Sequence, residues 1–194
     1  MGRRRRFDVD EALDAALCVF WRKGYEGASY TDLTEAAGVE RLALYSAFGN
    51  KEALFQKALE RYSERYLGFI PEALELPTAR DVAAHILHHS IELSTRHTDR
   101  TGCLLINGVL AGTDEAESVR QGPVKVRAAG ETRLRERFER AKAEGDLPDS
   151  AEPAVLAAFL MAVLHGPAVQ AKAGFSREKL EAVAGQALCA WPAA

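Results

Sequence analysis

The spacing of apolar residues is the feature that most restricts the fold of this chain. In most segments apolar positions recur every three or four residues, as they do on one face of an α-helix. The first such segment places Val9, Leu13, Leu17 and Phe20 on one face. No segment sustains the alternation of apolar and polar residues that marks a half-buried strand. The sequence therefore predicts an all-α fold.

Residues that start and stop helices divide this pattern into segments. Gly24 and Gly38 offer left-handed stops, Thr31 is the expected N-cap of a short helix, and Asn50 is that of a longer one, which should end at residues 68–71. The other predicted helices cover residues 9–23, 32–37, 41–48, 79–96, 103–110, 115–144, 153–172 and 176–191.

The last two predicted helices each carry a broad apolar face. One face runs from Val155 to Leu164 and the other from Leu180 to Trp191. Both patterns fit either the core of one chain or an interface between two chains. We favour a dimer interface, because a single bundle of this length rarely places so much apolar surface on its last two helices.

Composition narrows the class of protein. The chain has 194 residues, of which 47% are hydrophobic and 27% charged, as in an ordinary globular protein. The longest strongly apolar stretch, 11 residues from Ala154 to Leu164, is shorter than the ~20 residues that span a membrane. Three cysteines without metal-ligand spacing favour a reducing compartment, and no apolar signal-peptide region follows the N-terminal arginines. We expect a cytoplasmic protein with no membrane partner.

Two short predicted helices, 32–37 and 41–48, follow the plan of a helix-turn-helix, in which the second helix enters the DNA major groove. Leu44 and Phe48 share the side of the second helix that faces the core. The outward-facing residues are then Leu42, Ala43, Tyr45 and Ser46. The charge of the chain does not support DNA binding, because the net charge is −3 and residues 1–51 carry eight Lys or Arg against eight Asp or Glu. The spacing alone also fits a purely structural hairpin.

Three segments of this region resemble the TetR family of transcriptional regulators. They are Trp-Arg-Lys-Gly-Tyr-Glu-Gly-Ala-Ser from Trp21, Thr-Asp-Leu-Thr-Glu-Ala-Ala-Gly-Val from Thr31, and Leu-Tyr-Ser-Ala-Phe-Gly-Asn-Lys-Glu-Ala-Leu-Phe from Leu44. The resemblance implies an N-terminal three-helix helix-turn-helix DNA-binding domain, here residues 1–50. It also implies a C-terminal helical ligand-binding and dimerisation bundle, here residues 51–194, whose dimer is made largely by the last two long helices.

The resemblance also assigns residues to DNA. By position, Thr31, Tyr45 and Lys51 match phosphate contacts, and a hydroxyl, a phenol and an ammonium are ordinary phosphate partners. Arg41 and Ser46 are candidates for reading base edges. Leu42 and Ala43 replace the Gly or Pro and the Ser or Thr of many relatives, so they would contact thymine methyl groups instead of donating hydrogen bonds. The arm from Arg3 to Arg6 is either a minor-groove contact or a solubilising tail.

The C-terminal half is expected to hold a small-molecule effector in a mostly apolar pocket. The candidate lining residues are His88, Cys103, Asn107, Phe159, His165 and Lys172. The segment from Gly102 to Asn107 resembles a Gly-Cys-Leu segment in a subgroup of the family, some of whose members respond to reactive or unsaturated compounds. A thiol in the first turn of a helix gains thiolate character, and we expect Lys172 to approach Cys103 and favour an electrophilic effector. The alternative is an inert, buried Cys103 and a solvated Lys172.

The sequence thus predicts a ligand-responsive transcriptional regulator, most simply a repressor. It would bind a palindromic double-stranded DNA operator as a homodimer and leave it when a small molecule binds. We expect no catalytic residues, no cofactor and no metal, since His85, His88 and His89 lack further ligands with metal-site spacing. The alternative is a cytosolic helical thiol enzyme or small-molecule binding protein without a DNA role.

Overall fold

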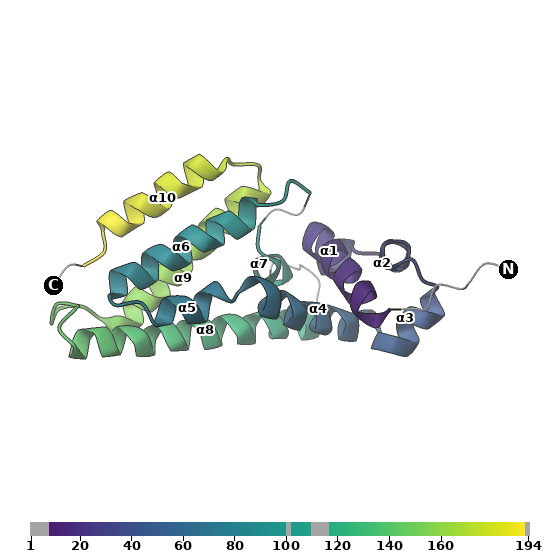
Figure 1. The fold of residues 1–194 in the computed structure, drawn as a ribbon, viewed down its shortest axis with the longest axis horizontal. Coiled ribbons are helices and arrows are strands. Elements are labelled where there is room, and N and C mark those ends of the chain that lie inside the picture. The colour runs from purple at the N-terminus through teal and green to yellow at the C-terminus, as the bar shows by residue number, and fades with distance from the viewer. Residues whose placement is uncertain (1–7, 100–101, 110–116, 193–194) are drawn as a thin grey trace.

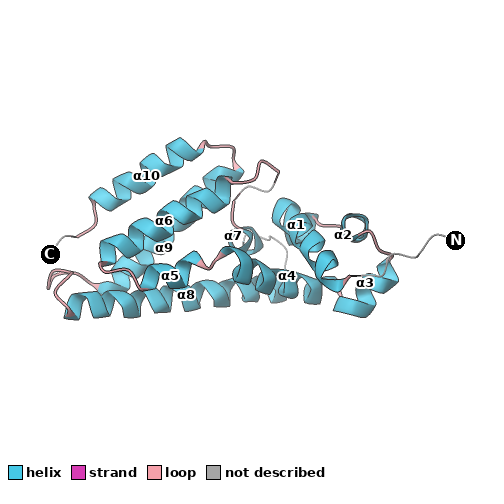
Figure 2. Ribbon diagram, in the orientation of Figure 1, coloured by secondary structure: helices cyan, strands magenta, loops and turns pink. Residues whose placement is uncertain are grey.

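The computed structural model describes residues 8–99, 102–109 and 117–192 of the chain. Within these ranges it contains helices and no strand (Figure 2), which confirms the all-α prediction. The helices are α1 (Val9–Gly27), α2 (Tyr30–Ala37), α3 (Arg41–Phe48), α4 (Lys51–Tyr66), α5 (Phe69–Leu74), α6 (Ala79–Thr95), α7 (Leu104–Val109), α8 (Glu117–Ala143), α9 (Pro153–Lys172) and α10 (Arg177–Cys189). The arm from Arg3 to Arg6 and the predicted helix ends at residues 110, 115 and 116 lie outside the described residues.

Several predicted helix boundaries are confirmed. Gly24 interrupts the helical path of α1 with a φ of 73°, and Gly38 ends α2 in the left-handed conformation with a φ of 65°. The Asn50 side chain accepts a hydrogen bond from the Ala53 amide at 2.8 Å and so caps α4. Helix α9 spans the predicted range 153–172. Local signals therefore placed most of the helices.

The predicted start of α2 is wrong by two residues. Ser29, and not Thr31, is its N-cap, because the Ser29 hydroxyl accepts a hydrogen bond from the Asp32 amide at 3.1 Å. In return, the Asp32 carboxylate accepts one from the Ser29 amide at 3.0 Å. This reciprocal pair satisfies two backbone donors at once, which a Thr31 cap would not do.

The break expected at residues 68–71 is also wrong in part, because it contains the start of α5. Pro71 lies in the first turn of this short helix. Backbone N–H groups in a first turn have no intrahelical acceptor, so the missing N–H of a proline costs no hydrogen bond there. The proline therefore starts a helix here instead of preventing one.

The helices are arranged along one long axis (Figure 1). Helices α1, α2 and α3 gather at one end, while α5, α6, α9 and α10 lie at the other. Helix α4 packs against α1, and the long α8 runs beside α9 and reaches back to contact α4. Helix α7 contacts both α1 and α8. Thus α4, α7 and α8 are the elements that join the two ends.

Two clusters of buried apolar side chains follow this division. One cluster lies among α1 to α4 and includes Phe20, Trp21 and Phe55, with Leu104 of α7 added to it. The other lies among α5, α6, α8, α9 and α10 and includes Phe138. Each end of the molecule therefore has its own apolar core.

Part of the apolar stripe predicted for residues 180–191 is buried in its own chain, so these side chains are not available to a partner as we expected. Leu180 and Trp191 are 0% and 7% exposed and belong to the core of their own chain, where the Trp191 ring lies 5.4 Å from that of Phe138. Helix α9 behaves differently, because Val155 and Phe159 remain 59% and 38% exposed. Outward apolar side chains therefore lie along α9, and Val183 of α10 is exposed as well.

Helix α9 is also the one described helix that is long and apolar enough to cross a membrane, which the sequence did not lead us to expect. Its 20 residues include a window with a mean hydropathy of 1.7, of which 33% is buried inside the chain. Length and composition alone are weak grounds, because a core helix of a soluble protein has the same properties.

Candidate functional site

The outer surface of α3 consists of residues that we predicted from the sequence to face outward. Leu44 and Phe48 are 3% and 5% exposed and lie in the core, as predicted. Leu42 is 77% exposed, and Arg41 and Ser46 are exposed as well. One face of α3 therefore fixes the helix to its domain, while the other is open to a partner. Ala43 and Tyr45 are half-buried between the two faces.

Phenol rings and cations from α1, α2, α3 and α4 form a cluster beside this surface. The Arg41 guanidinium lies 4.3 Å from the ring centroid of Tyr30, and its Nη2 donates a hydrogen bond to the Tyr45 hydroxyl at 3.2 Å. The Lys51 ammonium lies 4.5 Å from the ring centroid of Tyr25. Cation–π contacts restrain these long side chains, so both cations are positioned in advance of any partner. The sequence reading missed Tyr30, although an aromatic residue next to Thr31 was a signal for it.

The electrostatics of the cluster suit an anion. Burial raises the pKa of the Tyr45 phenol, but hydrogen bonds with Tyr30 and Arg41 and the charges of Arg41 and Lys51 outweigh burial, and the pKa is lowered. Burial lowers the pKa of the Lys51 ammonium, because it disfavours the charged form. A phosphate oxygen placed here would meet two cations and a phenol. Thr31 is exposed in the first turn of α2, at the same end of the molecule.

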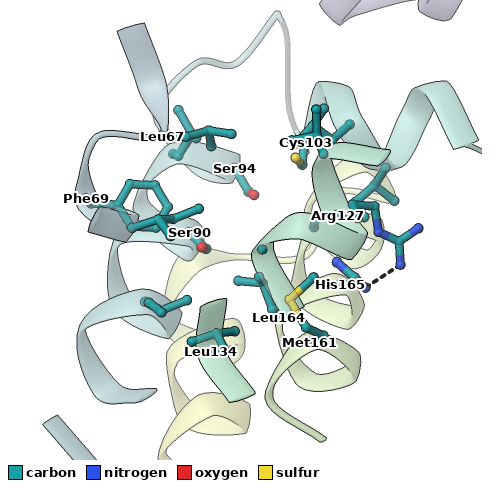
Figure 3. A pocket seen from close by; sticks show the side chains of 18 residues that line it. Leu67, Phe69, Ser90, Ser94, Cys103, Arg127, Leu134, Met161, Leu164 and His165 are labelled. Atoms are coloured by element: carbon teal, nitrogen blue, oxygen red, sulfur yellow. Dashed lines mark hydrogen bonds between the residues drawn. The ribbon is translucent and has the colours of Figure 1, made fainter. Parts of the chain in front are cut away.

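A cavity of about 90 Å³ lies in the other half of the chain, between α5, α6, α7, α8 and α9 (Figure 3). Leucine, isoleucine, valine, phenylalanine and methionine side chains make up most of its wall. The polar lining residues are Ser90, Ser94, Cys103, Arg127 and His165. A mostly apolar wall with a few polar groups is typical of a small-molecule site.

Arg127 of α8 and His165 of α9 point toward each other in this wall (Figure 3). The distance from Arg127 Nη2 to His165 Nδ1 is 2.9 Å. Burial, together with the charge of Arg127, lowers the pKa of His165 to about 4. The imidazole is therefore neutral near pH 7, and Nδ1 is the acceptor, because a guanidinium can only donate. This leaves the imidazole proton on Nε2.

Cys103 lines the cavity and also contacts the other half of the molecule. The Tyr62 hydroxyl of α4 donates a hydrogen bond to its sulfur at 3.5 Å. The neighbouring Gly102 accepts one from Trp21 Nε1 of α1 at 2.9 Å. Gly102 has a φ of 79°, and a Cβ at this position would lie 2.8 Å from the carbonyl oxygen of Ala168. A glycine is therefore required before Cys103 for both backbone conformation and space.

The other effector candidates do not line this cavity. His88 and Phe159 are exposed on the outside of α6 and α9. Asn107 Nδ2 donates to the Trp21 carbonyl at 3.5 Å, and Lys172 Nζ donates to the Arg22 carbonyl at 2.8 Å. Of the six candidates, the structure brings Cys103 and His165 together in the wall. Arg127 and the two serines were missed, because no periodic pattern shows which polar residue of a helix faces an internal cavity.

The histidines of α6 pack against one another. The rings of His85 and His89 stack with their centroids 4.0 Å apart. Among the described residues, no group of three or more His, Cys, Asp or Glu side chains is placed to hold a metal ion.

Comparisons with known proteins agree with this two-part arrangement. Residues 12–58 match the family model described as bacterial regulatory proteins of the tetR family, and residues 83–186 match that of the tetracyclin repressor-like C-terminal domain. The HTH-type transcriptional repressor ComR of Escherichia coli K12 is 32% identical over 98% of this chain and 92% of its own length. The repressor BdcR of the same organism is 29% identical over 96% of this chain and 90% of its own length.

A solved structure gives the same result in three dimensions. A cysteine mutant of the TetR-family regulator CifR, in complex with a 26-base-pair operator DNA, superposes with a TM-score of 0.91. It is 41% identical and covers 98% of this chain and 100% of its own. Sequence, fold and family models therefore agree that this chain belongs to the TetR family of bacterial transcriptional regulators.

Proposed function

We propose that this regulator is a repressor that binds a palindromic operator as a homodimer and is released when a small molecule occupies the cavity. The observation that carries the proposal is the exposed face of α3 beside the cluster of Tyr30, Arg41, Tyr45 and Lys51. ComR and BdcR are named repressors, and the CifR structure contains operator DNA. Operator binding implies a cytoplasmic location.

The residues at the DNA surface would have two kinds of role. Thr31, Tyr45 and Lys51 would bind phosphates and so position α3 without selecting a sequence. The residues that would select the sequence are Arg41, Leu42, Ala43 and Ser46. Leu42 is the most exposed of the large apolar side chains that the structure describes, which suits contact with a thymine methyl group.

Dimerisation would use the outward face of α9. Val155, Phe159 and Val169 are 59%, 38% and 45% exposed and share this helix. An exposed apolar stripe of this kind is typical of an interface between identical subunits. The division at residue 50, with DNA binding before it and effector binding and dimerisation after it, is part of the same proposal.

Release from DNA would follow from the position of the cavity between the two ends. Leu67, directly after α4, lines the cavity, and Cys103 in the same wall bonds to Tyr62 of α4. A ligand that shifts either residue would move α4 relative to its partner in the dimer. The two recognition helices must lie ~34–36 Å apart to enter successive major grooves, so such a shift weakens binding.

The electrophilic effector expected from the sequence is a separate part of this proposal. Cys103 is in the wall, where a reactive ligand would meet it, but the Lys172 ammonium is bound to the Arg22 carbonyl. Alkylation rates measured against pH, with Cys18→Ser and Cys189→Ser to isolate this thiol, test the idea. Slow reaction with a pH midpoint near the ~8.5 of a free thiol would exclude it.

The test of the main proposal is selection of bound sequences from random duplex DNA. We expect an enriched palindrome with half-sites one helical turn apart and an affinity that falls steeply with salt. A selection without enrichment would overturn the proposal. Turnover of a substrate that is lost in Cys103→Ala would instead favour the thiol enzyme.

A further inference from the structure

The polar groups of the cavity wall indicate which charge a bound ligand would carry. Among the residues that the structure describes, the wall includes one guanidinium, that of Arg127, and no aspartate or glutamate. No ion pair of Arg127 is found among the described residues. Arg127 is half-buried, and no carboxylate among the described lining residues balances its charge, so an anion in the cavity would be favoured and a second cation disfavoured.

Arg127 also has a hydrogen-bond donor without an acceptor. Its Nε atom is buried and has no hydrogen-bond partner in the described part of the chain, although its Nη2 is bound to His165. A buried donor without a partner costs free energy that a ligand acceptor would recover. The arginine fork matches a planar carboxylate especially well, since two parallel hydrogen bonds can form.

The rest of the wall fits a short apolar body. Phe69, Leu134, Met161 and Leu164 lie around the cavity in Figure 3, with Ser90 and Ser94 on α6. A cavity of 150 Å³ accepts benzene, so the ~90 Å³ present here corresponds to a chain of about four carbon atoms. The remaining space is too apolar for a sugar or a nucleotide.

We infer that the cavity takes a short aliphatic monocarboxylate, whose carboxylate binds Arg127 and whose chain lies among the apolar side chains. The inference rests on the proposed function, because it names the chemical class of that effector. It concerns the polar end of the ligand and does not depend on reaction at Cys103.

Calorimetric titration of the full-length protein with a matched set of probes tests this inference. Pentanoate, pentanamide and pentylamine share one chain and differ in charge. We expect pentanoate to bind about tenfold or more tightly than pentanamide, since hydrogen bonds to charged groups are stronger, and pentylamine not to bind. Equal affinities for the acid and the amide would overturn the inference.

Variants assign the effect to Arg127. Arg127→Met should weaken pentanoate binding about tenfold or more and leave pentanamide within about threefold. Arg133→Met is the matched control, because Arg133 is exposed on the same helix and does not line the cavity. Unchanged pentanoate binding in Arg127→Met would contradict the inference.

Two further measurements address a variant that does not fold and separate this inference from the proposed function. If Arg127→Met does not fold, the Nε–H signals of the wild-type arginines in ¹⁵N spectra still report whether pentanoate shifts one of them, and no shift would overturn the inference. Operator binding is measured separately. A protein that binds its operator but not pentanoate contradicts this inference alone, whereas one that binds pentanoate but no DNA supports it and refutes the proposed repressor.

Discussion

The cluster around Tyr45 shows how single side chains can be positioned before a partner arrives. Arg41 is held between two phenols, and Lys51 lies over the Tyr25 ring. Ordering these side chains in advance reduces the entropy lost on binding. The contribution of each to DNA affinity should therefore be measurable by single substitutions.

Tyr45→Phe and Lys51→Ala should weaken binding to all DNA sequences alike, by about tenfold each, because both residues are assigned to phosphates. Gel-shift titrations on operator and random duplexes measure this. Lys57→Ala, at an exposed lysine further along α4, is the control for charge. A change of base preference at one operator position would contradict the phosphate role.

Leu42→Ala should behave in the opposite way. Its side chain is 77% exposed, and loss of a methyl contact affects only sites with thymine at the matching position. We expect the preferred base to change while affinity for random DNA stays within about twofold. Repeating the selection with this variant measures both quantities, and an unchanged consensus would place Leu42 outside the groove.

His165 should make stability depend on pH. Its pKa is lowered to about 4 in the folded chain from an ordinary value of 6.5. Above pH 6.5 the imidazole is neutral in both states. As the pH falls from 6.5 toward 4, the unfolded chain takes up a proton that the folded chain does not, so the free energy of unfolding decreases.

We expect this loss to be about 1 kcal/mol, after allowance for solvent around a half-buried ring. His165→Asn should remove it, so that the variant loses less stability than the wild type over this pH range. Urea unfolding at several pH values gives the comparison, with His88→Asn as the control at an exposed histidine. Parallel curves for wild type and His165→Asn would show that His165 is not responsible.

At the scale of whole elements, α9 and α10 differ in which way their apolar faces point. Both carry helical stripes of apolar residues, but Leu180 of α10 and Trp191, just after this helix, point into their own chain. Helix α9 buries Leu160 on one side and leaves Phe159 at the surface on another. The two helices therefore contribute differently to the core, and α9 carries the surface at which we propose that the dimer forms.

Trp191→Asp should destabilise the chain by at least about 3 kcal/mol, because it removes a large buried ring and buries a charge. Phe159→Asp should leave the melting temperature of the protomer nearly unchanged and separate the dimer, because a charge would lie unpaired in the interface. Sedimentation at several concentrations and thermal melting distinguish the two. Intact dimers in Phe159→Asp would place the interface elsewhere.

At the scale of the whole molecule, the C-terminal part of α1 is a further place where the two halves meet. Trp21 donates to Gly102, while the carbonyls of Trp21 and Arg22 accept hydrogen bonds from Asn107 and Lys172. These bonds connect α1 to the segment that contains Cys103 and to the end of α9. The cavity wall is therefore linked to the DNA-binding end through α1 as well as through α4.

Lys172→Met should weaken this link while keeping most of the apolar side chain. Because Lys172 is exposed, we expect a loss of less than about 1 kcal/mol, or a fall in melting temperature of at most about 2–4 °C. Hydrogen exchange should also become faster at the C-terminal end of α1. Lys179→Met on α10 is the control, and equal exchange in both variants would contradict a bond between Lys172 and α1.

The sequence by itself determined most of the helices, although not α5, because capping residues and apolar spacing act within a few residues of the chain. The α3 surface could be predicted for the same reason, since Leu44 and Phe48 fix which residues of one short helix face outward. Tertiary structure decided the rest. Whether the Trp191 stripe faces its own core or a partner, and whether Arg127 meets His165, depends on how distant helices pack, and helical spacing is the same in either case.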